Sequence, residues 1–250
     1  MSRITIPARG GSFGAYLASP EKTPAPAIVL LQEVYGVNRF MRRIADFWAV
    51  EGFIAVCPEL YWRIGPGIEL DPETPGHRER ALETRQGMDI DAAVEDVIAT
   101  VAQIRRMPES NGRVGTSGYC LGGLLAYLTA TRGDADCNVS YYGVGIENYL
   151  GEAGQLRNPL MLHIGGADPW TPPEVQQKLA DTLGRNPHVT IHTYPGVGHA
   201  FAREGAATDV PEARARANAR TRSFFGEILL AHEPTPAAAF QSDANRPPER

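Results

Sequence analysis

The stretch VGTSGYCLGGLLAYL, residues 114–128, reads as a short strand, a cysteine between glycines and the start of a helix. Its centre, GYCLG, matches the G-x-S-x-G nucleophile elbow, with the thiol of Cys120 in place of a hydroxyl. In such an elbow Gly118 and Gly122 are needed because neighbouring backbone leaves no room for side chains beside the sharp turn. The following helix directs free N–H groups at the sulfur. The alternative is that Cys120 is a buried, inert thiol.

Strand-like and helix-like segments alternate on both sides of this turn. Strands are expected at 27–32, 53–60, 113–119, 138–142, 159–165 and 189–194. Helices are expected after Asn38, within 77–107, after Cys120, at 173–183 and at 212–230. This alternation is typical of an α/β protein with a mostly parallel central sheet and helices on both faces. We predict one domain over residues 1–232 and, because 233–250 is rich in proline without apolar periodicity, a poorly ordered tail.

The composition is that of an ordinary soluble globular protein, with 43% hydrophobic and 21% charged residues. A formal net charge of −5 and the lack of a lysine or arginine run argue against a nucleic-acid partner. No apolar run is long enough to span a membrane and no secretory signal is evident, so a cytoplasmic monomer is expected. The three cysteines lack paired spacing, and no nucleotide-binding motif is complete. We therefore expect no disulfide, metal or cofactor.

A nucleophile needs a base and a residue that orients the base, and the chain offers both after predicted strands. Asp168 lies in HIGGADPW and His199 in YPGVGHAF, each just beyond a strand. Nucleophile, acid and histidine in this chain order are typical of α/β-hydrolases. We predict that His199 takes the proton of Cys120, that Asp168 fixes the imidazole, and that the thiolate attacks an ester or lactone carbonyl. The alternative for His199 is a loop histidine satisfied by local hydrogen bonds.

The tetrahedral intermediate of such an attack needs two hydrogen-bond donors for its oxyanion. One is expected from the backbone N–H of Leu121, which follows the nucleophile. The other is expected from the loop after strand 27–32, at Val34. Tyr35, beside that loop, is expected to line the wall of the substrate pocket.

Several segments around these residues resemble the dienelactone hydrolase (carboxymethylenebutenolidase) family. They are LLQEVYGVN at 30–38, AVCPELY at 55–61, GYCLGG at 118–123, YYGVG at 141–145, GGADPW at 165–170 and GHAFAR at 198–203. The resemblance runs from about residue 3 to residue 230. It implies an α/β-hydrolase fold and hydrolysis of a small anionic lactone, a dienelactone, to maleylacetate through a cysteine acyl-enzyme. In the family this reaction belongs to the breakdown of chlorinated aromatics through chlorocatechol.

The resemblance also implies roles for three charged residues. The glutamate of the family corresponds to Glu33, and its two arginines that bind the substrate carboxylate correspond to Arg78 and Arg203. In the family mechanism the resting cysteine is a neutral thiol and the glutamate pairs with the second arginine. The substrate carboxylate takes over that arginine, and the freed glutamate helps to deprotonate the cysteine. The alternatives are a solvated loop carboxylate for Glu33 and a helix-surface charge for Arg78.

Three positions depart from the family pattern near the pocket. Leu82 stands where the family has tyrosine, the family has a tryptophan near the position of Arg85, and Ala200 follows the histidine where the family has serine. These departures keep open a broader carboxylesterase or lactonase of the same fold. A non-catalytic protein that binds a ligand or senses oxidation through Cys120 is the alternative from another class, and Asp168 argues against it because a binder does not need that residue.

Overall fold

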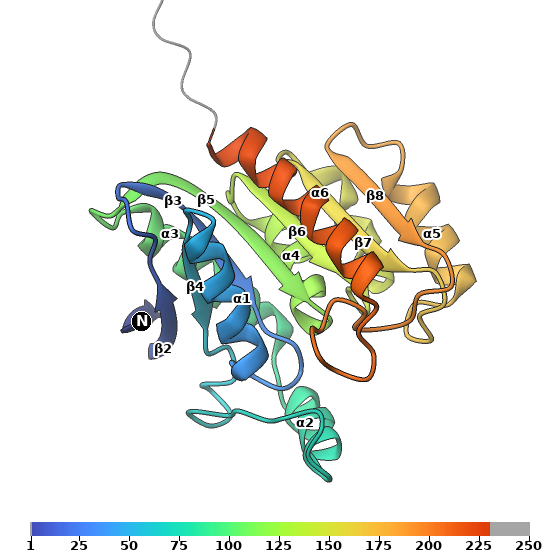
Figure 1. The fold of residues 1–250 in the computed structure, drawn as a ribbon, viewed down its shortest axis with the longest axis horizontal. Helices are drawn as coiled ribbons and strands as arrows, with labels where there is room; N and C mark the ends of the chain where they lie inside the picture. The colour runs from blue at the N-terminus through green and yellow to red at the C-terminus, as the bar shows by residue number, and fades with distance from the viewer. Residues whose placement is uncertain (1, 231–250) are drawn as a thin grey trace, which may run out of the picture.

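The centre of the molecule is an eight-stranded sheet with the order β1-β2-β4-β3-β5-β6-β7-β8 (Figure 1). The computed structural model describes residues 2–230. Six strands run parallel: β3 (Ala25–Leu31), β4 (Ile54–Pro58), β5 (Ser110–Tyr119), β6 (Cys137–Tyr141), β7 (Leu160–Gly165) and β8 (Val189–Tyr194). An antiparallel pair, β1 (Ser2–Ala8) and β2 (Gly11–Ala18), extends the sheet at the β4 edge. The predicted mostly parallel sheet is confirmed.

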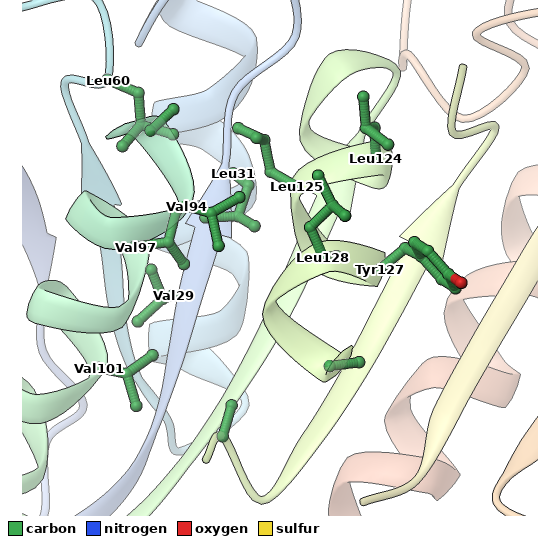
Figure 2. Packing of buried hydrophobic residues seen from close by; sticks show 14 of the residues in the cluster. Val29, Leu31, Leu60, Val94, Val97, Val101, Leu124, Leu125, Tyr127 and Leu128 are labelled. Carbon is green, nitrogen blue, oxygen red and sulfur yellow. The ribbon is translucent and has the colours of Figure 1, made fainter. Parts of the chain in front are cut away.

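The core lies on both faces of this sheet because its central strands are apolar throughout. All seven residues of β3 are buried. Ile28 and Leu30 face α1 (Arg39–Val50) and α6 (Pro211–Leu229) on one side. Val29 and Leu31 face the other side, which holds α3 (Ile90–Arg105), α4 (Leu121–Arg132) and α5 (Pro173–Leu183). Figure 2 shows valines of α3 and leucines of α4 packed against Val29 and Leu31.

All five predicted helical regions are helical, but one of them contains two helices. The first is α1, whose N-terminal N–H of Met41 donates to the side chain of Asn38 at 3.2 Å. The predicted helical region 77–107 divides into α2 (His77–Gln86) and α3, because Gly87 ends the first helix and Asp89 caps the second. Two short 3₁₀ helices, Ile146–Asn148 and Leu150–Gln155, precede β7.

Helix α2 lies apart from the sheet, beyond the carboxyl ends of the parallel strands (Figure 1). Its sequence is almost entirely polar, and Ala81 is its one fully buried residue. Ala81 packs with Tyr35 and Leu70, which belong to the loops around the strand ends. Ligands of open α/β sheets bind at this end of the strands. Helix α2 therefore forms a wall over the edge of the sheet where the site is expected.

Within residues 2–230, no helix combines the length and the apolar character that a membrane crossing requires. The domain boundary that we predict at residue 232 and the tail 233–250 lie outside the described residues.

Candidate active site

Cys120 stands on the turn between β5 and α4 in a backbone conformation that residues with a side chain rarely adopt, with φ +55° and ψ −113°. The two glycines of the elbow have no room for a side chain. A Cβ on Gly118 would collide with the carbonyl oxygen of Gly122, and a Cβ on Gly122 would collide with that of Leu31. The amide of Cys120 donates to the carbonyl of Tyr141 at 3.0 Å. The structure thus holds the thiol on a strained turn at the helix N-terminus.

Asp168 and His199 meet in the loops that follow β7 and β8. The Nδ1 of His199 lies 2.7 Å from Oδ2 of Asp168, whose side chain is completely buried. The other carboxylate oxygen of Asp168 accepts the backbone N–H of Trp170 at 2.8 Å. These bonds fix the carboxylate, and the carboxylate fixes the imidazole. Cys120 and His199 line the same cavity, so the structure brings the three predicted residues together in one place.

The surroundings of His199 favour its protonated form. Burial by itself lowers the pKa of His199, but the hydrogen bonds and negative charges of Asp168 and Cys120 outweigh it and raise the pKa to about 10. An imidazolium between a carboxylate and a thiolate is the state reached once the proton of Cys120 has moved. A raised pKa of His199 is compatible with its predicted role as the acceptor of the Cys120 proton, which remains a prediction.

A pH-dependent stability follows from this raised pKa. Protonated His199 stabilises the fold fully below its ordinary value of 6.5, and this contribution is lost as the pH rises through about 10. We expect the difference in unfolding free energy between wild type and His199→Gln to shrink by more than about 1 kcal/mol between pH 6 and pH 10. Urea denaturation at both pH values measures it. A difference that does not change with pH would contradict the raised pKa.

Glu33 and Arg203 form a buried ion pair beside the nucleophile. The Nε and Nη2 atoms of Arg203 each lie 2.9 Å from Oε2 of Glu33, and the two side chains are 11% and 1% exposed. The hydroxyl of Tyr142 donates to Oε1 of Glu33 at 3.4 Å. Burial lowers the pKa of Arg203, but the charge of Glu33 raises it by more. Glu33 is thus a buried partner of Arg203, which is the arrangement the resemblance implies, and is not a solvated loop carboxylate.

The two backbone groups expected to bind the oxyanion lie on the same cavity as Cys120. Leu121 is the first residue of α4, where the N–H groups have no partner within the helix. Val34 follows β3, and its carbonyl accepts the hydroxyl of Tyr61 at 3.1 Å. Within the described part of the chain, neither N–H donates a hydrogen bond to another residue. Both donors remain a prediction.

A cavity of about 680 Å³ surrounds the thiol. It brings together most of the predicted site residues: Val34, Tyr35, Arg78, Cys120, Leu121, His199 and Arg203. Glu33 and Asp168 do not line it, but each contacts a residue that does, Arg203 and His199 respectively. The departures Leu82, Arg85 and Ala200 line the same cavity, together with Trp170. Arg78 is exposed and also lines the cavity, so its role as a substrate ligand remains a prediction.

A larger hollow of about 910 Å³ lies beside α1 and α6. It shares Arg203 with the first cavity but includes neither Cys120 nor His199. We therefore assign the chemistry to the smaller cavity. Among residues 2–230, no group of three or more histidine, cysteine or acidic side chains is arranged to hold a metal ion.

Tyr142 is a site residue that the sequence reasoning did not identify. Its backbone has φ +40°, and its ring packs edge-on against His199 with the centroids 5.1 Å apart. Its hydroxyl reaches Glu33, so one side chain contacts both the base and the buried ion pair. The segment YYGVG contains this tyrosine, but two adjacent tyrosines at a strand end carry no sign of which one faces a site.

Comparisons with known proteins agree with this geometry. The sequence profile of the dienelactone hydrolase family matches residues 13–229. A carboxymethylenebutenolidase of Pseudomonas putida is 42% identical over 219 residues, which cover 88% of this chain and 93% of the relative. Another carboxymethylenebutenolidase, from Cupriavidus pinatubonensis, is also 42% identical over 219 residues, with the same coverage of 88% and 93%.

A solved structure from Klebsiella pneumoniae has a TM-score of 0.80 at 24% identity, with 90% of this chain and 98% of that chain covered. This likeness confirms the predicted α/β-hydrolase fold. The family profile and the curated relatives each extend over most of the residues in which the motifs were found. The resemblance that those motifs indicate is therefore confirmed, and the chain belongs to the dienelactone hydrolase family.

Proposed function

We propose that this protein hydrolyses a dienelactone, a small anionic lactone, to maleylacetate. The observation that carries the proposal is the cavity in which Cys120, His199 and three arginines, Arg78, Arg85 and Arg203, meet. A nucleophile paired with a base suits acyl transfer, and arginines beside it suit a substrate that carries a carboxylate. The names of the Pseudomonas and Cupriavidus relatives support the same substrate class.

In the proposed mechanism the proton of Cys120 moves to Nε2 of His199, while Asp168 holds Nδ1. The thiolate then attacks the lactone carbonyl and forms a tetrahedral oxyanion, which the N–H groups of Leu121 and Val34 stabilise. When the ring C–O bond breaks, the leaving oxygen takes the proton from His199 and a thioester remains. Water, deprotonated by His199, attacks the thioester and releases the acid, and the proton returns to Cys120. No cofactor enters this sequence.

The buried pair of Glu33 and Arg203 gives the substrate carboxylate a role in this activation. Arginine binds a carboxylate through two parallel hydrogen bonds, so a substrate carboxylate can replace Glu33 on Arg203. A Glu33 side chain that loses this partner in a buried place is a stronger proton acceptor. We propose that this exchange helps to remove the proton of Cys120 when the anionic substrate is bound: the freed Glu33 accepts the proton first, and His199 receives it before the ring C–O bond breaks. Tyr35 and Arg78 complete the binding site.

The test is the specificity constant, kcat/KM, on three substrates: a dienelactone, a saturated lactone of similar size and a neutral aryl ester. Strong preference for the dienelactone would support the proposed reaction. Better turnover of the neutral ester would agree with the proposed mechanism but would show that a dienelactone is not the preferred substrate. No turnover of any of them, together with fast alkylation of Cys120 by iodoacetamide, would support a thiol-sensing protein instead.

We expect Arg203→Ala to lower kcat/KM for the anionic lactone about 10- to 100-fold more than for the neutral ester, because only the former needs a cationic partner. The single variant also leaves the charge of Glu33 buried without its partner, which is destabilising. The double variant Glu33→Gln/Arg203→Ala removes both charges and keeps the comparison valid. Equal losses on both substrates in the double variant would mean that Arg203 is structural.

A broader carboxylesterase is the second candidate, and two exposed apolar side chains favour it. Leu82 and Trp170 are 39% and 48% exposed, and both line the cavity. Large exposed apolar groups at a cavity suit an apolar acyl or alcohol group. The neutral aryl ester in the substrate panel tests this candidate directly.

A further inference from the structure

One face of helix α2 presents two arginines to the active-site cavity. Arg78, Leu82 and Arg85 are spaced i, i+4 and i+7, which places them in a row on one side of a helix. All three line the cavity that contains Cys120, and Gln86 extends the row. Arg80 belongs to the same helix but does not line the cavity. Helix α2 thus directs a specific subset of its charges towards the reactive centre.

Neither Arg78 nor Arg85 has a carboxylate partner within 4.0 Å in the described part of the chain. This distinguishes them from Arg203, which is held by Glu33. Glu73 also lines the cavity, as an exposed side chain, without pairing with either arginine. Cationic side chains that face a cavity without a protein counter-ion are suited to an anion that enters from solution.

Arg85 also lies near the catalytic groups. Its charge acts on Tyr61, whose pKa is raised by burial and partly lowered again by Arg85. Cys120 acts on the same hydroxyl, which donates to the carbonyl of Val34 in the proposed oxyanion loop. Arg85 is half-buried, so its charge is less screened than that of a surface arginine.

The cavity has room for more than one anionic contact. Seven residues of helix separate Arg78 from Arg85, which corresponds to about 10 Å along the axis. A volume of about 680 Å³ lies in the range of pockets that enclose drug-sized ligands, larger than a lactone with a single short acid group. A ligand held at Arg203 and Arg78 therefore leaves the part of the cavity beside Arg85 open.

We propose that Arg85 forms a second anion-binding position, so that a dienelactone or ester carrying a second acidic group is preferred over its counterpart with one. One carboxylate engages Arg203 and Arg78, and the second, several bonds away, engages Arg85. The inference rests on the proposed function for the site of hydrolysis, and it adds the substrate class that this chain selects.

The experiment measures binding without turnover. Linear dicarboxylates from succinate to suberate, each paired with the monocarboxylate of equal length, are titrated calorimetrically into full-length Cys120→Ala protein. At the best length, the dicarboxylate is expected to bind about tenfold tighter than its monocarboxylate, the effect of one charge-assisted contact at a half-buried site. Adding Arg85→Ala or Arg85→Gln is expected to abolish this preference and leave monocarboxylate binding unchanged. Adding Arg80→Ala, the matched control on the same helix, is expected to preserve it.

Two results would overturn the proposal: no preference for dicarboxylates at any length, or a preference that survives both substitutions of Arg85. Equal weakening of mono- and dicarboxylates in the Arg85 variants would also overturn it, because it would indicate general attraction of anions. These readouts do not require the enzyme to hydrolyse a lactone. Failure of the proposed reaction and failure of the second anion-binding position are therefore separate outcomes.

Discussion

Replacing Cys120 with alanine is expected to abolish hydrolysis, with kcat falling by a factor on the order of 10⁶. The reason is chemical: no other thiol lies on the cavity, because Cys57 and Cys137 are completely buried in the core. What remains in the variant is binding and the oxyanion donors, which stabilise a transition state but cannot form the thioester. Steady-state kinetics on the preferred lactone, with single-turnover detection of the thioester in the wild type, measure the effect.

The fold of this variant is expected to remain. Alanine and cysteine both carry a Cβ, so the strain at φ +55° is the same in the two proteins. The matched control is Cys57→Ala, which removes a thiol that is 0% exposed and donates to the carbonyl of Met41 at 3.5 Å. We expect that control to lose about 1 kcal/mol of stability and to keep its activity. Residual activity of Cys120→Ala above a few per cent would exclude a cysteine acyl-enzyme.

The central part of the fold could be predicted because its strands are buried on both faces. A run such as 27–32 is apolar at every position, which leaves little choice but a strand between two helical layers. The antiparallel strands β1 and β2 were not predicted. They lie at the edge of the sheet, where most buried residues alternate with more exposed ones, and Pro7, Gly11 and Gly14 have low strand propensity. Such half-exposed strands leave a weaker pattern.

Helix α2 shows a second reason why part of the structure could not be predicted from the sequence. Its one fully buried residue is Ala81, so no apolar stripe marks its boundary with α3 or the face it turns to the cavity. The sequence could not decide between Arg78 as a ligand and Arg78 as a surface charge, since both depend on where the helix lies. Folding places the helix by docking Ala81 against Tyr35 and Leu70, and Arg78 then lines the cavity. Its role as a substrate ligand stays a prediction.

The contact between Asp168 and His199 was easier to predict because both residues follow strands whose order is fixed by the sheet. Asp168 and His199 come after neighbouring strands β7 and β8, and the carboxyl ends of parallel strands meet at one edge. The contact of Tyr142 with Glu33 could not be predicted. It joins residues 109 positions apart and depends on the backbone turn after β6.

Asp168→Asn is expected to lower kcat about 10⁴-fold while leaving the shape of the site unchanged. The asparagine oxygen can still accept the N–H of Trp170, so its amide group faces Nδ1 of His199. Because that group donates, Nδ1 must become the acceptor and the ring proton moves to Nε2. The nitrogen that should receive the proton of Cys120 is then already protonated, and the thiolate does not form.

The loss of the aspartate charge has a second consequence that separates this mechanism from simple damage to the fold. The pKa of His199 in Asp168→Asn should fall from about 10 towards its ordinary range, because the carboxylate supports the imidazolium. NMR titration of the His199 ring measures this pKa in parallel with kcat.

Asp181→Asn is the matched control, because Asp181 is an exposed aspartate on α5 that accepts a hydrogen bond from Gln177 at 2.8 Å. It should change neither value. If Asp168→Asn retained activity within about tenfold of the wild type, His199 would not be the base oriented by Asp168, and Glu33 would have to be tested as the proton acceptor in its place.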